Sequence, residues 1–218
     1  MASAGPRAVS SSGQAGAAAG AGAGAEAGEE NSRYFPKMTQ RGISPIHRAP
    51  NPIDPGVRIG HVHLRTADID RVRAFYVDIL GFDVVAEERN VSGWGTTGDV
   101  LFVSAGGYHH LLGFNTWKSA GGRPQPDGVT GLHHVALNYP TRAGLADAVR
   151  RLQRAGVPLR QLSDHGTHEA VYLSDPDGNA LELAWDRPMD QWPHGEGGGL
   201  PPIFGDLDLD DLLAEPEV

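Results

Sequence analysis

Apolar and polar residues follow the same order twice along this chain, once after His61 and again after His134. Each segment opens with apolar residues at alternate positions, the pattern of a half-buried strand, and continues with apolar residues at helical spacing. A glycine then interrupts each helical pattern, Gly81 in the first segment and Gly156 in the second. The pattern therefore predicts a strand, a helix and a glycine stop in both halves of an internal repeat.

The two predicted helices are both amphipathic. The first is expected to span 68–80 with Asp68 as its N-cap, because a carboxylate there accepts bonds from the free N–H groups of the first turn. Its buried stripe comprises Ile69, Val72, Phe75, Tyr76, Ile79 and Leu80. The second helix has a similar stripe, which comprises Leu145, Ala148, Val149 and Leu152. Both helices should therefore cover one face of a sheet.

Short apolar segments after each helix predict three further strands in each half of the repeat. They are expected at 83–86, 100–104 and 108–114 in the first half, and at 159–162, 170–173 and 180–185 in the second. The segment SDPDGNA at 174–180 has the residues of a tight turn between the last two strands. Each half is thus a βαβββ module, and we predict an α+β fold in which two such modules pair into one curved mixed sheet.

Composition divides the chain into three regions. Residues 1–56 are rich in Ala, Gly and Pro and have little apolar surface to bury, so we expect a disordered extension. Residues 57–193 should form the folded domain. Its two modules are expected at 57–118 and 131–188. Residues 194–218 form an acidic tail, in which six acidic side chains occupy the last thirteen positions.

The composition also excludes several classes of function. Because the chain has no cysteine, it has no disulfide, thiolate zinc site, iron–sulfur cluster or cysteine nucleophile, which suits a reducing cytoplasm. The formal net charge of −9 argues against a nucleic-acid partner. No apolar segment has the roughly 20 residues that cross a bilayer. We therefore expect a cytoplasmic protein with neither a nucleic-acid nor a membrane partner.

Alternation along the strands indicates which polar residues share a face. Apolar residues mark the side of each strand that faces the helices: these are Val62, Leu64, Val135, Leu137, Leu181, Leu183 and Trp185. His61 and His63 of the first strand should therefore face the opposite, concave side. The same reasoning places His134 and Glu182 there and turns His133 away from it.

His61, His134 and Glu182 form a set of donors typical of a mononuclear metal site. Two neutral imidazoles and one carboxylate are the facial triad of non-haem Fe(II) proteins, which leaves coordination positions open for ligands. A strand histidine taken alone is more often structural, and a lone glutamate in a terminal strand is usually solvated. The repeat favours metal binding over these structural and solvated roles, because His61 and His134 occupy the same place in the two modules. We therefore predict that these three residues bind a metal.

Two motifs resemble those of the vicinal-oxygen-chelate superfamily. They are HVHLRTADIDRVRAFYVDILGF, which begins at His61, and DPDGNALEL, which begins at Asp175. The superfamily includes glyoxalases, fosfomycin-resistance and bleomycin-resistance proteins, and type I extradiol dioxygenases. The resemblance covers about 57–193 and implies the fold without choosing among these chemistries.

Finer motifs are similar to the bacterial catechol 2,3-dioxygenases of this superfamily. They are SAGGYHHLLGFNTW at 104–117, SDHGTHEAVYLSDPDGNALELAWDRP at 163–188 and LDLDDLLAE at 207–215. The resemblance matches His61, His134 and Glu182 to the metal ligands. It also matches His110 to the histidine that faces bound oxygen, His165 to the acid–base histidine and Tyr172 to the tyrosine that hydrogen-bonds the substrate. The spacing between the last two is shorter than in the better-known ring-cleaving enzymes, and His168 lies close by.

The resemblance implies an extradiol dioxygenase that cleaves a catechol ring with O2 at Fe(II), with Mn(II) as the other metal to consider. The expected partners are a small aromatic substrate, O2 and a second copy of the chain in a homodimer. Such enzymes usually have four βαβββ units, whereas this chain has two. Closure over the substrate must then come from the acidic tail or from the second subunit.

Two other functions fit the same superfamily. One is a non-oxidative metal-dependent enzyme, such as a fosfomycin-type thiol transferase, an epimerase or a lyase, which uses the same donor set. The other is a metal-free binding protein of the bleomycin-resistance type, against which the intact triad argues.

Overall fold

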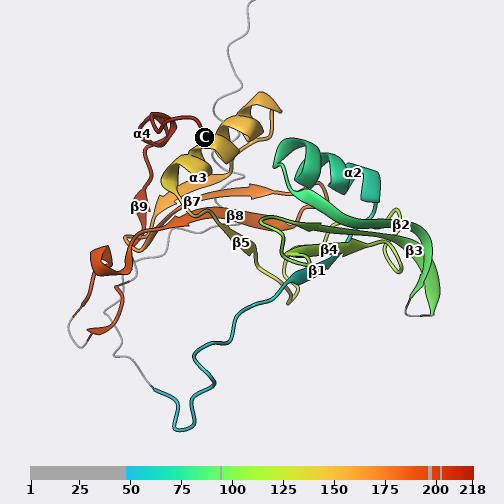
Figure 1. Cartoon of the computed structure of the whole chain (residues 1–218), viewed down its shortest axis with the longest axis horizontal. Helices are drawn as coiled ribbons and strands as arrows, with labels where there is room; N and C mark the ends of the chain where they lie inside the picture. The colour runs from blue at the N-terminus through green and yellow to red at the C-terminus, as the bar shows by residue number, and fades with distance from the viewer. Residues whose placement is uncertain (1–47, 94, 196–197, 202) are drawn as a thin grey trace, which may run out of the picture. The chain divides into compact units, whose positions relative to one another are not determined.

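The computed structural model describes residues 48–93, 95–195, 198–201 and 203–218. The prediction of a disordered extension falls largely outside these residues, which include only its last part. Within the described part, the elements of the first module follow the predicted order (Figure 1). They are β1 (Val62–Arg65), α2 (Ile69–Arg73), the π-helix η1 (Ala74–Ile79), β2 (Asp83–Gly93), β3 (Thr96–Ser104) and β4 (Leu112–Asn115).

The second module repeats this order and is followed by short C-terminal elements. Its elements are β5 (Val135–Asn138), α3 (Arg142–Arg154), β6 (Gln161–Asp164), β7 (His168–Ser174) and β8 (Ala180–Asp186). The later elements are the 3-10 helix η2 (Met189–Gln191), β9 (Gly205–Asp206) and α4 (Leu209–Leu213). In the described residues, no helix is long and apolar enough to pass through a bilayer.

The strands form two mixed sheets, one for each module. Their orders are β1-β4-β3-β2 and β5-β8-β7-β6-β9, and the first and last strands of each module pair in parallel. The two βαβββ modules are therefore confirmed, but the prediction of one continuous sheet is corrected. β1 and β5 are both edge strands, each hydrogen-bonded to the last strand of its own module. Alternation predicts which side of a strand is buried, and it carries no information about which edges pair.

The helix boundaries follow from capping. Asp68 is the N-cap of α2, where its side chain accepts bonds from the N–H groups of Asp70 and Arg71. Gly81 has a φ of 86°, the left-handed conformation expected where the first helix ends. The structure differs from the prediction at Ala74–Ile79, which form a π-helix. Apolar spacing alone cannot distinguish this widened turn from a continued α-helix.

Both helices lie on one side of the sheets (Figure 1), and a single apolar core fills the space beneath them. Leu101 and Leu183 from the strands and Leu145 from α3 are fully buried in it. The two modules are also joined by a polar contact, because the hydroxyl of buried Tyr76 donates to Asp175 at 3.1 Å. The helix of the first module is thus bonded to the β7–β8 turn of the second.

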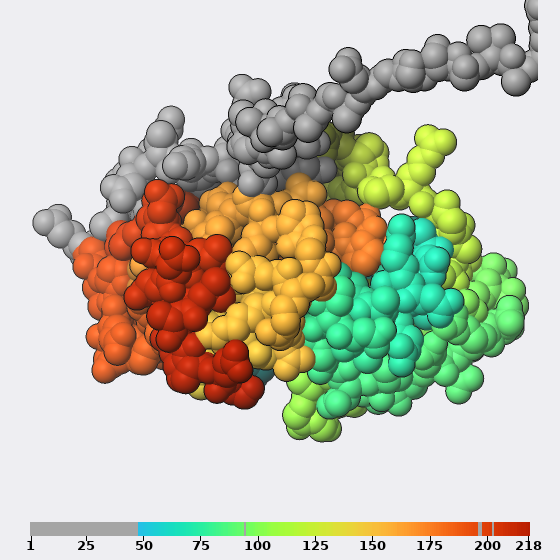
Figure 2. Space-filling model, turned by 90° about the horizontal axis from the view of Figure 1, so that it is seen from above, coloured from blue at the N-terminus to red at the C-terminus, as the bar shows by residue number. Residues whose placement is uncertain are grey.

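The acidic C-terminal segment packs on the second module. β9 extends the second sheet by pairing with β6, and α4 lies against α3 (Figure 2). Leu212 of α4 is fully buried in the core. Arg142, at the start of α3, makes ion pairs with Asp211 at 2.7 Å and Glu215 at 3.0 Å. Part of the segment's negative charge is therefore neutralised by the helix on which it packs.

Candidate metal and acid–base site

The centre of the site is formed by the parallel pair of β5 and β8. Glu182 on β8 lies opposite Ala136 on β5, and its side chain is buried at 5% exposure. Its neighbours Leu181 and Leu183 face the core, so the alternation predicted for this strand is confirmed. His134 immediately precedes β5, and its Nε2 lies 2.9 Å from Glu182 Oε2. Two of the three predicted ligands are thus in direct contact.

The neighbouring strand β7 adds two side chains to the same face. Tyr172 is the cross-strand partner of Glu182, and its hydroxyl hydrogen-bonds that carboxylate. His168 lies four residues before Tyr172, and its Nε2 is 3.1 Å from Glu182 Oε1. Both carboxylate oxygens of Glu182 are therefore bound by a histidine.

His165 is held between Tyr172 and the C-terminal segment. Its Nδ1 lies 3.1 Å from the carbonyl oxygen of Ile203, and its Nε2 lies 3.1 Å from the Tyr172 hydroxyl. A carbonyl oxygen can only accept, so Nδ1 carries the proton and Nε2 faces Tyr172. The His165 ring also stacks on His168 and meets the edge of Phe204. These contacts fix the orientation of the ring.

Burial and mutual contact shift the pKa values of this cluster. Burial, followed by the charge and hydrogen bond of Glu182, raises the pKa of Tyr172 well above its usual range. Burial alone would raise the pKa of Glu182, but the hydrogen bond from His168 and the nearby His134 hold it below its usual value. Burial and then the neighbouring His168 lower the pKa of His165. At neutral pH the cluster therefore contains a carboxylate, a neutral phenol and a neutral His165.

His61 and His110 come together in the first module. The His61 ring, just before β1, lies 4.3 Å from that of His110, which in turn lies 4.8 Å from Phe102. The Nδ1 atoms of His109 and His110 are 2.8 Å apart. Burial, and then the nearby His61 and His109, lower the pKa of His110. The first module thus brings the rings of His61, His109 and His110 together.

His63 lies on the same strand and is positioned by Gly113 of β4. A Cβ on Gly113 would approach the His63 ring to 3.0 Å, so the ring needs a glycine opposite it. The ring nitrogen Nε2 of His63 lies 2.9 Å from Asn115 Nδ2. The predicted placement of His63 on the polar face of β1 fits these contacts.

The predicted ligands fit a divalent metal in chemistry and, for two of them, in position. Imidazole nitrogens and a carboxylate are the donors that such ions take. His134 and Glu182 already present their donor atoms to each other at 2.9 Å. His61 belongs to the other module, where its ring contacts are with His109 and His110. In the described part of the chain, no three His, Asp or Glu side chains are grouped closely enough to hold an ion, so the triad stays a prediction.

His168 is the one member of the cluster to which the sequence analysis gave no role. The signal was available in the alternation of β7, since His168 and Tyr172 are four residues apart and share a face. The strand was predicted to begin only at 170, which left His168 in the preceding turn. Extending the strand by two residues would have placed His168 on the same face as Tyr172 and Glu182.

Residues 58–183 match the model of the family described as the Glyoxalase/Bleomycin resistance protein/Dioxygenase superfamily. The chain belongs to this superfamily. The resemblance drawn from the motifs is thereby confirmed, and members of the superfamily include enzymes and binding proteins. A superfamily member from Frankia sp. EAN1pec has the same fold, with a TM-score of 0.50 and 20% identity over 61% of this chain and 94% of that one.

Several curated relatives in the superfamily are dioxygenases. A catechol-2,3-dioxygenase from Bacillus subtilis is 35% identical over 54% of this chain and 37% of its own length. Biphenyl-2,3-diol 1,2-dioxygenase 3 from Rhodococcus globerulus is 31% identical over 60% of this chain and 64% of its own length. The chain therefore spans between about a third and two thirds of these relatives.

Other superfamily members carry out different chemistry. A probable lactoylglutathione lyase from Synechocystis is 28% identical over 56% of this chain and 91% of its own length. Membership alone thus leaves both oxidative and non-oxidative reactions open.

Proposed function

We propose that this protein is an extradiol dioxygenase, which cleaves a catechol-type substrate with O2 at a mononuclear non-haem metal. The observation that carries the proposal is the convergence of His134, His165 and Tyr172 around the buried Glu182. The carboxylate of Glu182 and the imidazole of His134 supply metal donors, while the imidazole of His165 and the phenol of Tyr172 supply proton transfer and substrate binding. The dioxygenases among the relatives support the same assignment.

In this proposal His61, His134 and Glu182 hold Fe(II), or Mn(II) in its place. The bound ion would act as a Lewis acid and as a template that brings catechol and O2 together. Because His61 comes from the first module and the other two from the second, substrate would bind where the two modules meet. Glu182 is already unprotonated in its surroundings, which suits a ligand role.

His165 would accept a proton from a catechol hydroxyl and return it later in the reaction. Its Nε2 suits this task, because Nδ1 is occupied by the Ile203 carbonyl and a neutral ring is then basic only at Nε2. Tyr172 would donate a hydrogen bond to a substrate oxygen, since its raised pKa keeps the hydroxyl protonated. His110 would face the oxygen-binding side and stabilise charge that develops there.

Oxygen uptake tests this proposal. Protein purified without oxygen and loaded with Fe(II) should consume O2 when catechols are added, and should form yellow ring-opened products. The metal content is measured on the same sample. A fully loaded protein that consumes no O2 with any simple or substituted catechol would contradict the proposal.

A second candidate is a non-oxidative metal-dependent enzyme such as a lyase. It is favoured by one observation, namely that the chain covers 91% of the probable lactoylglutathione lyase and much less of the dioxygenases. Such an enzyme would turn over its substrate with no change in dissolved O2. The oxygen measurement therefore separates the two candidates.

A further inference from the structure

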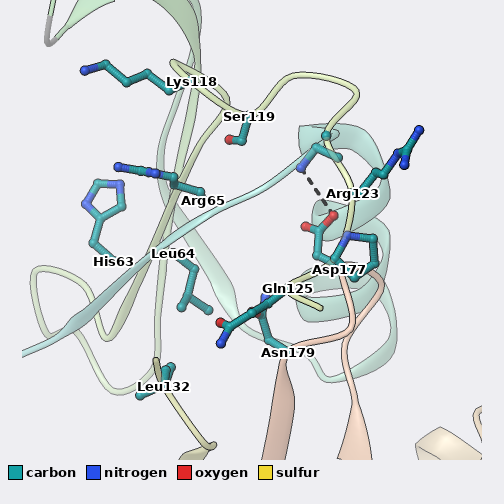
Figure 3. Close-up of a pocket in the computed structure, with 13 residues that line it drawn as sticks. His63, Leu64, Arg65, Lys118, Ser119, Arg123, Gln125, Leu132, Asp177 and Asn179 are labelled. Atoms are coloured by element: carbon teal, nitrogen blue, oxygen red, sulfur yellow. Dashed lines mark hydrogen bonds between the residues drawn. The ribbon is translucent and has the colours of Figure 1, made fainter. Parts of the chain in front are cut away.

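A cavity of about 520 Å³ lies beside β1, outside the cluster around Glu182. Its walls come from β1, from the segment after β4 and from the β7–β8 turn (Figure 3). This volume is within the range of small-molecule sites. His63, Arg65 and Lys118 form one side of it, and Figure 3 shows their side chains pointing the same way.

The two cations on this side have no counter-charge. In the part of the chain that the structure describes, the side chains of Arg65 and Lys118 make no ion pair and no hydrogen bond. The carboxylate in the cavity wall, Asp177, is already bound by Arg71 at 2.5 Å and by the N–H of Ala67 at 3.2 Å. Its charge is therefore neutralised from the other side of the cavity.

The unpaired cations of this wall contrast with the ion-paired arginines of the same chain. The formal net charge is −9, and several arginines of the described residues lie among carboxylates. Arg89, Arg142 and Arg187 each contact at least two acidic side chains. Two cations left unpaired in the same cavity wall thus offer a place for an anion brought by a ligand.

The strand β1 connects this cavity to the proposed metal site. Alternation puts His61, His63 and Arg65 on one face, and the burial of Leu64 on the other face agrees with it. His61 and Arg65 are four residues apart, which is about 13 Å along an extended strand, and His63 lies between them. An aromatic ring bound on the His63 side of His61 would point an acidic substituent toward Arg65, whose long side chain can extend back along the strand. Arg65 and Lys118 also line a second, smaller cavity of about 190 Å³.

We propose that Arg65 and Lys118 bind an anionic substituent of the substrate, so that the protein prefers catechols bearing a carboxylate. The inference rests on the proposed ring-cleaving function and names the substrate class for it. The guanidinium of Arg65 would bind both oxygens of the carboxylate, with Lys118 as a second positive charge. His63, which Asn115 orients, lies between this pair and the metal site.

Binding of a matched pair of ligands tests the inference. The probes are 3,4-dihydroxybenzoate and 3,4-dihydroxybenzamide, which differ in charge and little in shape. Their affinities for iron-loaded protein are measured by calorimetry without oxygen, so that no turnover is needed. We expect the carboxylate to bind more tightly, and Arg65→Gln or Lys118→Gln to weaken it about tenfold while leaving the amide unchanged.

Arg123→Gln is the matched control. Arg123 lines the same cavity, but Figure 3 shows its side chain pointing away from Arg65 and Lys118. Its replacement should change neither affinity. Equal affinities of wild-type protein for the two probes, or an equal loss in all three variants, would overturn the inference.

The oxygen measurement separates this inference from the function on which it rests. Oxygen uptake with catechols, together with no discrimination between carboxylate and amide, would contradict the anion site and leave the dioxygenase proposal standing. Preferential carboxylate binding that depends on Arg65, without any oxygen uptake, would support the anion site and contradict the dioxygenase.

Discussion

His165 is bonded at both ring nitrogens, and this shapes what the residue can do. The carbonyl of Ile203 fixes the proton on Nδ1, while Nε2 points at Tyr172. The hydroxyl of Tyr172 has one proton and two acceptors, His165 and Glu182. A substrate oxygen entering here would compete for that proton, which links substrate binding to the state of His165.

His165→Ala should slow turnover strongly without loss of metal. A positioned acid–base group contributes about 10²- to 10⁴-fold to a rate. We therefore expect kcat to fall by that factor while iron content stays unchanged, as measured by oxygen uptake and metal analysis. The kcat of Tyr172→Phe should fall less, by roughly tenfold, since this change removes one hydrogen bond and keeps the ring. His194→Ala, at an exposed position, is the control. A His165→Ala protein with full activity would rule out the assigned role.

A second residue-scale prediction concerns acid stability. Burial would raise the pKa of Asp164, but hydrogen bonds from Arg187 and the Gly166 N–H lower it below 3.8. A carboxyl group whose pKa is lower in the folded than in the unfolded state stabilises the fold at pH values above its unfolded-state pKa. This contribution is lost as the pH falls through the folded-state pKa. Asp164→Asn should therefore lower Tm at pH 7, and the difference should shrink below about pH 4. Asp190→Asn, at an exposed position, should show no such trend.

At the residue scale, much of the cluster could be predicted. The alternation of polar and apolar residues identified His134 and Glu182, and the family resemblance added His165 and Tyr172. The carbonyl of Ile203 could not be found in this way, because every residue has a carbonyl and only tertiary packing selects one. The same holds for the unpaired state of Arg65, which depends on where the acidic side chains lie.

At the scale of elements, the C-terminal segment is part of the second module. β9 pairs with β6, and α4 buries Leu212 against α3. The acidic composition predicted a C-terminal tail at 194–218. Composition reports the charge of this segment and not the few apolar residues that dock it on the second module. The helices were predicted well, because their caps and apolar stripes are local signals. The two-residue strand β9 has no such signal.

Removing the anchor of α4 should destabilise the fold. Leu212→Ala leaves a cavity in the core, and such changes cost about 2–5 kcal/mol. We expect a lower free energy of unfolding in urea and a weaker hold of Ile203 on His165, seen as a changed pH profile of kcat. Leu200→Ala, at a position 46% exposed, should change stability by less than about 0.5 kcal/mol. Equal stabilities of the two variants would mean that α4 does not anchor the segment.

At the scale of the whole molecule, the proposed metal would join the two modules. His61 comes from the first and His134 and Glu182 from the second, while β1 and β5 are edges of separate sheets. An ion bound by all three would therefore add a link that the strands do not provide. The sequence could predict the donors but not this division, because strand pairing across a repeat is not encoded in alternation.

Metal should consequently stabilise the fold. A ligand that binds only the folded state raises its stability, by about 2.7 kcal/mol at a hundredfold excess over Kd. Fe(II) or Mn(II) should raise the Tm of wild-type protein and leave that of His61→Ala and Glu182→Ala unchanged. His63→Ala, outside the proposed donor set, should retain the increase. An undiminished shift in the Glu182→Ala protein would exclude this residue as a ligand.

The hydrogen bond between Tyr76 and Asp175 has a consequence for how the chain folds. The two residues are 99 positions apart, and Tyr76 lies in the core beneath the first helix. The first module therefore lacks a partner for a buried hydroxyl until the β7–β8 turn has formed. Contacts this distant in sequence slow folding, because the intervening chain must be closed into a loop before they stabilise anything. During synthesis, the first module would complete its folding only after the second module has left the ribosome, and both would then fold together.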